Sequence, residues 1–527
     1  MAALSRERAI AVIGSGAMGA GIAQVAAVAG YTVKLYDSRP EAVARAMSDI
    51  AAALNRQVDK GRMSAVDAAA AIARVTAALA LQDVAGAALV VEAIVEKLEA
   101  KRALFAQLEA IVADDCILVT NTSSISVTAI AAGLRLPGRL AGMHFFNPVP
   151  LMALVEVVQG LATDADVAQS VMDTAAALGK SPVLARSTPG FIVNRVARPY
   201  YAEAWRLLAE GAGDAATIDA VLREAGGFRM GPFELMDLIG HDVNFAVTNS
   251  VFRAYFHDPR FTPSVLQQEL VDAGFLGRKT GRGCYRYGAG ELAPPPQAEA
   301  PQPAPDYVSY TQDAGAVAAR AHPHGGAVTD ALAARLRAKG IDVAHRKPAD
   351  IRQHTTDDAP AFHCNGAAVY LTDGRSATRR AADNHHPDTV LVDLAFDYGS
   401  ATRIAVACAD QCAPAAYHAV VGLFQAAGLI VTRLDDVPGM AVMRTVAMLA
   451  NEAADAVNQG VCSAAGADTA MQQGVNYPRG PLAWADAVGI GHIVDVLANL
   501  AASYGEDRYR VSPLLRRKHA AGADIHA

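Results

Sequence analysis

The sequence predicts an α/β domain with a doubly wound sheet, then an all-α domain, then a degenerate α/β segment and a second copy of the all-α domain. Three observations lead to this fold class. Short apolar runs typical of strands alternate with helical stretches up to about residue 187, and from there the pattern is helical only. A proline-rich stretch follows at 288–306. A sequence repeat relates the part before this stretch to the part after it.

The first α/β domain is expected to span residues 5–187. Its strands are short apolar runs, and the stretches between them are alanine-rich or amphipathic, as helices are. A long amphipathic stretch covers 40–60, and a Glu/Lys-rich helix ends near 113. The expected strands are 9–13, 31–36, 89–92, 117–120 and 141–144.

The next segments follow from composition. Residues 188–287 have only helical patterns, at 191–210, 215–225 and from 231 onward, and form the all-α domain. Residues 288–306 carry six prolines and almost nothing that could pack in a core, so we expect an extended, semi-rigid linker. Residues 307–437 have short apolar runs but no glycine-rich turn between strand and helix, which predicts the degenerate α/β domain.

The second all-α domain, 438–527, is predicted from an internal duplication. Pro189-Gly-Phe-Ile-Val-Asn-Arg aligns with Pro438-Gly-Met-Ala-Val-Met-Arg at a constant offset of 249 residues. At this offset, 14 of the 52 positions in 189–240 are identical without a gap. The identities include turn formers and charges, for example Gly231-Pro232 with Gly480-Pro481, and are not confined to interchangeable alanines.

The composition is that of a globular protein with no preference for polyanions. Of the 527 residues, 52% are hydrophobic and 19% are charged, the net charge is −7 and the pI is about 6.1. This charge argues against a nucleic-acid or anionic-membrane surface. No apolar run approaches the ~18 residues of a membrane span, and residues 1–8 leave no room for a signal peptide. We therefore expect a cytoplasmic protein that binds neither nucleic acid nor membrane.

The cysteines and histidines predict no metal site. The six cysteines are scattered without a CxxC pair, which is typical of thiols in a reducing compartment. Histidines are frequent between 345 and 418, but their spacing is irregular. They stand at 345, 354, 363, 385, 386 and 418.

A glycine fingerprint follows the first expected strand. Gly14-Ser-Gly-Ala-Met-Gly19 opens a helix, and Asp37 ends the next strand 18 residues after Gly19. This context predicts a Rossmann-like dinucleotide site, with a pyrophosphate at the helix N-terminus beside Gly14, Gly16, Ala17, Met18 and Gly19. Asp37 should accept the ribose hydroxyls and repel a 2′-phosphate, which favours NAD over NADP. The alternative is a glycine turn in another α/β fold.

Residues 144–156 combine a titratable imidazole with a carboxylate in apolar surroundings. Charged groups are rarely buried unless something pairs with them. The turn around 148–150 could fold Glu156 back towards His144, and a histidine oriented by a carboxylate is a general base. The alternative is a core histidine with a surface glutamate nearby.

Five separated motifs, in order, resemble the L-3-hydroxyacyl-CoA dehydrogenase family over residues 9–287. Besides the fingerprint, they are Val91-Glu-Ala-Ile-Val-Glu96, Asn121-Thr-Ser-Ser124, His144-Phe-Phe-Asn-Pro-Val, Gly190-Phe-Ile-Val-Asn194 and Gly277-Arg-Lys-Thr-Gly281. The two-half layout looks like the long bacterial members, including those of phenylacetate breakdown. The resemblance implies NAD-dependent oxidation of L-3-hydroxyacyl-CoA in fatty-acid or related acyl-CoA metabolism.

The resemblance also implies residue roles. His144 would be the base, Glu156 would orient its ring, and Ser123 and Asn194 would bind substrate oxygens. Residues expected along the cofactor are Glu96, Lys101, Asn147 and Lys279. Lys60 would meet the CoA phosphates, although the serine that usually accompanies it corresponds to Ala53. Alternatively, 121–124 is a plain helix cap and Lys60 a solvated charge.

The second half departs from the pattern. Aligning Arg403-Ile404 with Arg139-Leu140 puts Cys408 where His144 stands and leaves no counterpart of Glu156, and Met443 replaces Asn194. We therefore expect a catalytically silent second half. Since short members of the family look like dimers paired through the helical domain, it would make the chain an intramolecular pseudo-dimer, with further homo-oligomerisation open.

Two other functions stay open from the sequence. One is a dehydrogenase of free hydroxy or sugar acids on the same scaffold, and the other is a non-catalytic CoA- or NAD-binding protein. An ω-carboxylate on the acyl group of the substrate would need a cation in the acyl pocket. Three arginines are candidates for this cation: Arg195, Arg198 and Arg206.

Overall fold

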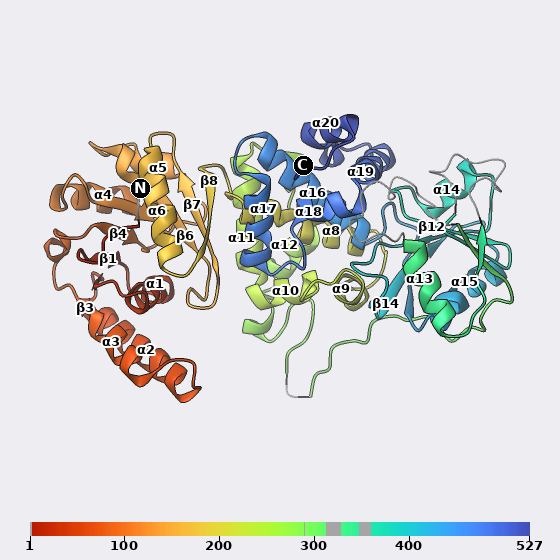
Figure 1. Cartoon of the computed structure of the whole chain (residues 1–527), viewed down its shortest axis with the longest axis horizontal. Coiled ribbons are helices and arrows are strands. Elements are labelled where there is room, and N and C mark those ends of the chain that lie inside the picture. The colour runs from red at the N-terminus through yellow and green to blue at the C-terminus, as the bar shows by residue number, and fades with distance from the viewer. Residues whose placement is uncertain (1–2, 289, 312–327, 347–359) are drawn as a thin grey trace. The chain divides into compact units, whose positions relative to one another are not determined.

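The computed structural model describes residues 3–288, 290–311, 328–346 and 360–527 (Figure 1). The chain forms two compact units. One consists of Met1–Arg195 with Gln459–Val475, and the other of Val196–Asn458 with Asn476–Ala527. A short segment from the second half of the sequence therefore belongs to the unit built by the first half.

The first unit is built on an eight-stranded sheet in the order β3-β2-β1-β4-β5-β6-β7-β8. Neighbouring strands are parallel except β6 and β7, which are antiparallel. The strand order reverses between β1 and β4, the place where doubly wound sheets bind ligands. The strands are β1 (Ile10–Ile13), β2 (Val33–Tyr36), β3 (Val75–Ala77), β4 (Leu89–Glu92), β5 (Ile117–Thr120), β6 (Leu140–Phe145), β7 (Leu154–Gln159) and β8 (Ser181–Arg186).

The sequence pattern predicted five of these strands and missed β3, β7 and β8. Strands β1, β4 and β5 are buried along their whole length, so they read as continuous apolar runs. By contrast, β8 alternates buried and exposed residues, and β7 carries the charge of Glu156 in a buried position. Both features weaken the apolar signal.

Helices cover the sheet of the first unit and close its core. Helix α1 (Ala17–Val28) is alanine-rich, and its residues Ile22, Ala23 and Ala26 pack in the core beside the strands. Helices α2 (Pro40–Asp59) and α3 (Ala65–Arg74) pack on each other (Figure 1). The other helices of this unit are α4 (Leu98–Ile111), α5 (Val127–Ala131), α6 (Ala165–Ala177) and α17 (Ala464–Val475), which packs on β7 and β8. The division between the two units at Arg195 falls within the short helix α7 (Val193–Val196).

The second unit contains both copies of the helical repeat, except for helix α17 of the second copy, which belongs to the first unit. Helices α8 (Arg198–Ala209) and α16 (Val442–Asn458), which correspond at the offset of 249, pack on each other. Arg444 lies buried between them, with its Nε 2.7 Å from the carboxylate of Glu203. The other helices of the repeats are α9 (Ala215–Glu224), α10 (Pro232–Ile239), α11 (His241–Ala254), α12 (Val265–Asp272), α18 (Pro481–Val488), α19 (Ile490–Tyr504) and α20 (Pro513–Ala521).

The second unit also holds a seven-stranded sheet in the order β10-β9-β11-β12-β13-β14-β15. As in the first sheet, the last two strands are parallel to each other, and the strand before them is antiparallel. The strands are β9 (Val308–Thr311), β10 (Ala344–Arg346), β11 (Phe362–Cys364), β12 (Ala367–Leu371), β13 (Thr389–Val392), β14 (Arg403–Cys408) and β15 (Ile430–Arg433). The helices between them are α13 (Val328–Ala338), α14 (Ala377–Asp383) and α15 (Pro414–Ala426).

The proline-rich segment is held against this unit. The N–H of Gln297 donates to the Thr217 hydroxyl over 2.9 Å, and the N–H of Glu299 donates to the carbonyl of Val431 over 2.8 Å. The guanidinium of Arg403 donates to the carbonyl of Gln297. The linker is therefore pinned at several points along its length.

The two sheets reveal that the duplication extends further back than residue 189. At the same offset of 249, β7 corresponds to β14, α6 to α15 and β8 to β15. The register agrees, because Leu154 pairs with Ser181 as Arg403 pairs with Ile430. The predicted alignment of Cys408 with His144 is therefore wrong. Asp393 takes the place of His144, and Ala405 takes the place of Glu156.

Within the described ranges, no single helix is long and apolar enough to cross a bilayer. Helices α18 and α19 reach that length and composition only together, and they are bent by 99° at their break.

Candidate active site

The glycine turn is shaped for a close approach of a ligand to the backbone. Gly14 has a φ of +103°, and a Cβ there would lie 2.5 Å from the Ala93 carbonyl oxygen. A Cβ at Gly19 would meet the Gly14 carbonyl, so the helix can start close to the strand only without side chains. Gly16 is the N-cap of α1 and has no heavy atom within 4 Å of its Cβ position among the described residues. The free N–H groups of Ala17 and Met18 follow it, which suits a pyrophosphate.

Asp37 directly follows β2 and points back to this turn. Its carboxylate accepts hydrogen bonds from the Ser15 N–H over 3.0 Å and the Ser15 hydroxyl over 2.9 Å, and from the Arg39 N–H over 3.1 Å. Partial burial alone would raise the pKa of Asp37, but these hydrogen bonds outweigh it and hold the pKa below its ordinary value. The carboxylate is thus ionised at neutral pH, as an acceptor of ribose hydroxyls needs to be.

His144 and Glu156 form a buried pair across β6 and β7. They are direct neighbours in the antiparallel register, and His144 Nδ1 lies 2.7 Å from Glu156 Oε2. The other carboxylate oxygen accepts the N–H groups of Ile192 and Val193 over 2.9 and 3.0 Å. Glu156 is fully buried and His144 is 5% exposed. The carboxylate is therefore fixed on both sides and fixes the imidazole.

The ring of His144 is also held by packing. Phe146 lies with its ring centroid 4.5 Å away, and the Phe191 ring meets it edge-on at 5.9 Å. Among the described residues, His144 Nε2 has no hydrogen-bond partner, so this nitrogen is available to a substrate. A histidine held in this way through Nδ1 presents Nε2 as a base.

Ser123 and Asn194 are brought together beside this pair. Asn194 Nδ2 donates to the backbone carbonyl of Ser123 over 3.4 Å, and both side chains are partly exposed. Asn194 directly follows Val193, whose N–H binds Glu156. The Ser123 loop is tied to the histidine strand, because Asn121 Oδ1 accepts the Phe145 N–H over 2.8 Å. Polar groups from two loops therefore converge near His144.

Glu96 and Lys101 hold the loop that carries Ser123. Lys101 is 1% exposed, and its Nζ lies 2.7 Å from Glu92 Oε1 and 3.1 Å from Glu96 Oε2. Glu96 Oε1 accepts the Thr122 hydroxyl and the Ser123 N–H. Although burial acts to raise the pKa of Glu96, the Thr122 hydroxyl and the Lys101 charge bring it below its ordinary value. A direct contact of Lys101 with a cofactor stays a prediction, since its ammonium group already binds both carboxylates.

Among the described residues, the other predicted site residues make no hydrogen bond to this cluster. Asn147 is exposed just after β6, and Lys60 is exposed at the C-cap of α2, about two helical turns after Ala53. Lys279 belongs to the other compact unit, where its Nζ contacts Asp242. Of the three arginines considered for an ω-carboxylate, Arg195 binds Gln459 and Arg206 binds Glu506.

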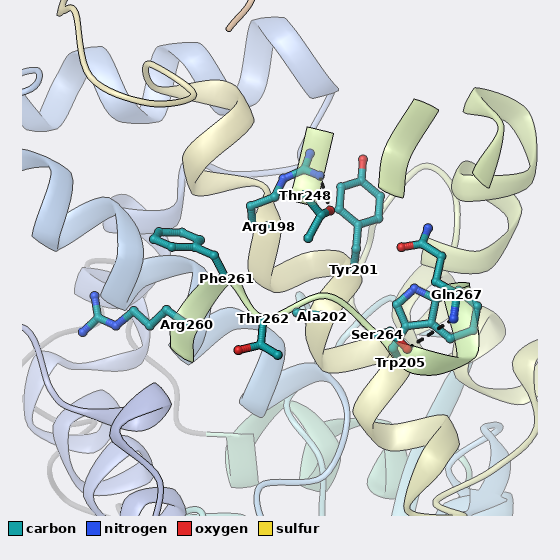
Figure 2. Close-up of a pocket in the computed structure, with 10 residues that line it drawn as sticks. All are labelled: Arg198, Tyr201, Ala202, Trp205, Thr248, Arg260, Phe261, Thr262, Ser264 and Gln267. Carbon is teal, nitrogen blue, oxygen red and sulfur yellow. Dashed lines mark hydrogen bonds between the residues drawn. The ribbon is translucent and has the colours of Figure 1, made fainter. Parts of the chain in front are cut away.

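The third arginine, Arg198, lines a small pocket on one face of α8 (Figure 2). Its guanidinium donates to the Thr248 hydroxyl over 3.0 Å and lies over the Tyr201 ring. Burial lowers the pKa of Arg198, and no carboxylate pairs with it among the described residues. The pocket is lined by Arg198, Tyr201, Ala202, Trp205, Thr248, Arg260, Phe261, Thr262, Ser264 and Gln267.

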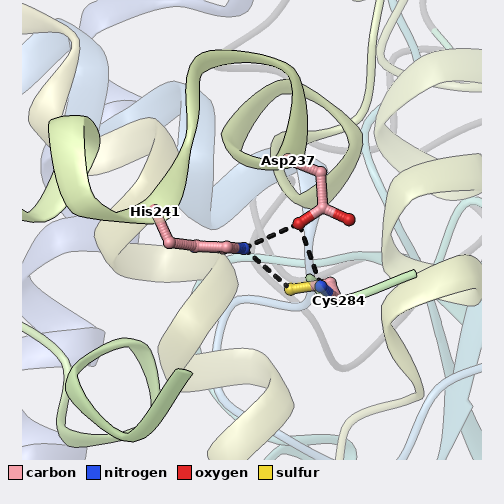
Figure 3. A group of neighbouring side chains, drawn as sticks. All are labelled: Asp237, His241 and Cys284. Carbon is pink, nitrogen blue, oxygen red and sulfur yellow. Dashed lines mark hydrogen bonds and ion pairs between the residues drawn. The ribbon is translucent and has the colours of Figure 1, made fainter. Parts of the chain in front are cut away.

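A second polar cluster in the same unit joins Asp237, His241 and Cys284 (Figure 3). His241 Nε2 lies 2.7 Å from Asp237 Oδ1 and 3.6 Å from Cys284 Sγ. The Asp237 carboxylate also accepts the N–H groups of Cys284 and Tyr285 and the Tyr287 hydroxyl. With four donors on one carboxylate, the group anchors the chain at 284–287 to α10. No local sequence pattern indicates this cluster, because Cys284 is 47 residues from Asp237.

The second half uses a different residue for the contacts of Glu156. Asp393 follows β13 and accepts the N–H groups of Ala441 and Val442 over 2.9 and 2.7 Å and that of Met443 over 3.0 Å. These are the counterparts of 192–194. Complete burial raises the pKa of Asp393 to about 6, against the opposing effect of these hydrogen bonds. The predicted loss of the Glu156 segment is therefore wrong, because the segment is present with Ala405 in that position.

Sequence models of one family match most of the chain. The 3-hydroxyacyl-CoA dehydrogenase NAD binding domain matches residues 9–188, and the C-terminal domain of the same family matches 190–287 and again 439–523. The 3-hydroxybutyryl-CoA dehydrogenase reduced Rossmann-fold domain matches 369–438. The chain belongs to the 3-hydroxyacyl-CoA dehydrogenase family. The predicted fold class, enzyme class and cofactor NAD are thereby confirmed.

The relatives include long chains that match both halves of this chain and short chains that match about half of it. The chain is 42% identical to the 3-hydroxyadipyl-CoA dehydrogenase of Escherichia coli K12 over 97% of each chain. A crystal structure of 3-hydroxybutyryl-CoA dehydrogenase from Escherichia coli K12 superposes with a TM-score of 0.85 at 41% identity and covers 98% of both chains. The (S)-3-hydroxybutyryl-CoA dehydrogenase of Ralstonia eutropha, at 39% identity and a TM-score of 0.52, covers 53% of this chain and 99% of its own.

Proposed function

We propose that the chain oxidises L-3-hydroxyacyl-CoA thioesters to 3-oxoacyl-CoA, with His144 as the general base. The observation that carries this proposal is the His144–Glu156 pair, whose carboxylate is anchored by two backbone N–H groups while Nε2 of the imidazole stays open. Oxidation of a secondary alcohol needs such a base at the hydroxyl. NAD supplies the acceptor for the hydride that leaves C3.

The protein groups then have separate tasks. Nε2 of His144 takes the hydroxyl proton, and the Glu156 carboxylate stabilises the imidazolium that forms. Ser123 and Asn194 hydrogen-bond the substrate oxygens and hold C3 in position for hydride transfer. Lys60 binds the CoA phosphates. Gly14, Gly16, Gly19 and Asp37 bind the dinucleotide, with Glu96, Asn147 and Lys279 as further cofactor residues.

The partner and location belong to the same proposal. We infer that the chain is a pseudo-dimer in which the second half replaces the second subunit of the shorter relatives. The packing of α8 on α16, with an ion pair between Glu203 and Arg444, supports this inference. All six cysteines are free thiols, which fits the cytoplasm. We propose that the reaction serves the breakdown of fatty acids, phenylacetate or other acyl-CoA compounds, which is consistent with the 42% identity to a 3-hydroxyadipyl-CoA dehydrogenase.

The experiment compares substrates. Oxidation of NADH with acetoacetyl-CoA and with free acetoacetate separates a CoA thioester enzyme from a dehydrogenase of free acids. We expect turnover of the thioester only, and equal turnover of both would overturn the proposal. The values of kcat/KM for 3-hydroxybutyryl-, 3-hydroxyhexanoyl- and 3-hydroxyadipyl-CoA then assign the acyl group.

A further inference from the structure

We propose that the segment Gln459–Val475 of the second half is a positioning element of the active centre in the first half. This inference rests on the proposed function of His144 and Glu156. The segment comprises a turn and helix α17, and it is part of the same compact unit as the catalytic sheet. Helix α17 packs on β7, which carries Glu156, and on β8 (Figure 1).

Three contacts join this segment to both sides of the catalytic pair. The Arg186 N–H at the end of β8 donates to the Val461 carbonyl over 2.8 Å. Arg195, which is 2% exposed and directly follows Asn194, donates to Gln459 Oε1 over 2.9 Å. The segment therefore holds the end of β8 and the short helix α7, which carries Asn194.

The third contact is a close approach at Gly474. A Cβ on this residue would lie 2.6 Å from Leu154 Cδ2 and 3.1 Å from Val193 Cγ2. Leu154 lies two residues before Glu156 on β7, and the Val193 N–H donates to Glu156. Both neighbours are buried, so they have little room to move away. A larger side chain at position 474 would therefore displace Leu154 and Val193, and with them the Glu156 carboxylate that orients His144.

The same contacts recur, with the halves exchanged, in the second unit. At the offset of 249, the Asp435 N–H donates to the Ala212 carbonyl over 3.0 Å, as Arg186 does to Val461. Arg444 binds the Glu210 carboxylate over 2.9 Å, as Arg195 binds Gln459. Helix α9 packs on β14, as α17 packs on β7. Each sheet is buttressed by the helical repeat of the other half, which is the reciprocity of a two-fold interface.

The test introduces bulk at Gly474 in the full-length protein. We expect Gly474→Leu to lower kcat with acetoacetyl-CoA about tenfold to hundredfold, since small misplacements of catalytic groups have effects of this size. The dissociation constant for NADH stays unchanged. Gln473→Leu adds the same side chain on the exposed face of α17 and serves as the matched control with unchanged kcat. Gly474→Ala, which adds only Cβ, gives a smaller loss and replaces Gly474→Leu if that variant does not fold.

Two further measurements separate positioning from general damage. Leu154→Ala combined with Gly474→Leu makes room for the added side chain and should restore kcat at least threefold relative to Gly474→Leu. Gln459→Ala should lower kcat, while Gln459→Glu, which copies the Arg444–Glu210 pair, keeps it. A folded Gly474→Leu protein with wild-type kcat overturns the proposal, and so does a double variant no more active than the single one.

Hydrogen exchange makes the result independent of the substrate. In Gly474→Leu, amide exchange of a peptide covering 189–195 should accelerate, because the Ile192 and Val193 N–H groups lose their fixed acceptor. This readout does not need turnover. If the wild-type protein failed to turn over CoA thioesters, the proposed function would be wrong, whereas unchanged exchange at 189–195 would sink the positioning role alone.

Discussion

The two sheets perform one structural task with different residues. In the first unit, Glu156 on β7 accepts the N–H groups of Ile192 and Val193, and in the second unit Asp393, next to β13, accepts those of Ala441 to Met443. The carboxylate comes from opposite members of the same strand pair. Placing it on β7 leaves the neighbouring position on β6 free for an imidazole. The comparison indicates that the proposed acid–base centre is a scaffold contact to which a histidine has been added.

The largest expected effect is on chemistry in the first half. His144→Gln removes the base, and we expect kcat with acetoacetyl-CoA to fall about 10³-fold to 10⁴-fold, the upper range for general acid–base catalysis. NADH binding should be unchanged, which fluorescence titration checks. Retention of more than a tenth of the turnover would break the assignment.

A smaller loss is expected from the residue that holds the base. In Glu156→Gln, one amide group must face the imidazole N–H and two backbone N–H groups, so at least one buried donor meets another donor. An unsatisfied buried donor costs about 1–3 kcal/mol of stability. We therefore expect kcat to fall about 10²-fold and the melting temperature to decrease. Steady-state kinetics and calorimetry test this, and a loss of stability without loss of kcat would contradict the orienting role.

The matching change in the second half should affect stability alone. Asp393→Ala leaves four buried N–H groups without this acceptor, those of Leu394 and of Ala441 to Met443, and we expect about 3 kcal/mol of destabilisation. Turnover per folded molecule should stay at the wild-type value, because the proposed chemistry does not involve Asp393. Thermal unfolding and kcat, measured on one preparation, decide the point.

The same residue predicts a pH dependence. The pKa of Asp393 rises from 3.8 to about 6 on folding because of burial, so the folded state binds the proton more tightly. Stability from this group is present below pH 4 and is lost as pH rises through 6, by about 3 kcal/mol at most. The wild type should therefore lose stability relative to Asp393→Asn between pH 4 and pH 7, as measured by urea unfolding. A difference that does not vary with pH would contradict the raised pKa.

The smallest effect is expected at Cys408. The sequence placed this thiol opposite His144, whereas the structure places it at the end of β14 in the position of Gln159. Cys408→Ser should leave kcat and the NADH dissociation constant within a factor of two. A larger change in kcat would restore a functional role for the second sheet.

Much of the candidate site could be predicted from local sequence patterns. The glycine fingerprint, Asp37 and the His144–Glu156 segment each lie within a few tens of residues, so turn chemistry and burial arguments reached them. The family motifs added Ser123 and Asn194, which the structure brings together. The features that could not be predicted depend on relations between residues far apart in the sequence. Identity in the duplication is detectable only from residue 189, so β7 and β14 could not be matched by sequence, and the contact of Val461 with Arg186 has no local signal.

The exchanged helix α17 also bears on the order in which the protein is made. The first unit is complete only with residues 459–475, which are separated from β8 by more than half of the chain. A ribosome has therefore synthesised the linker and the whole second sheet before the segment that supports the catalytic strands becomes available. Non-local contacts of this kind form late and slow folding. The catalytic half is translated first and finished last.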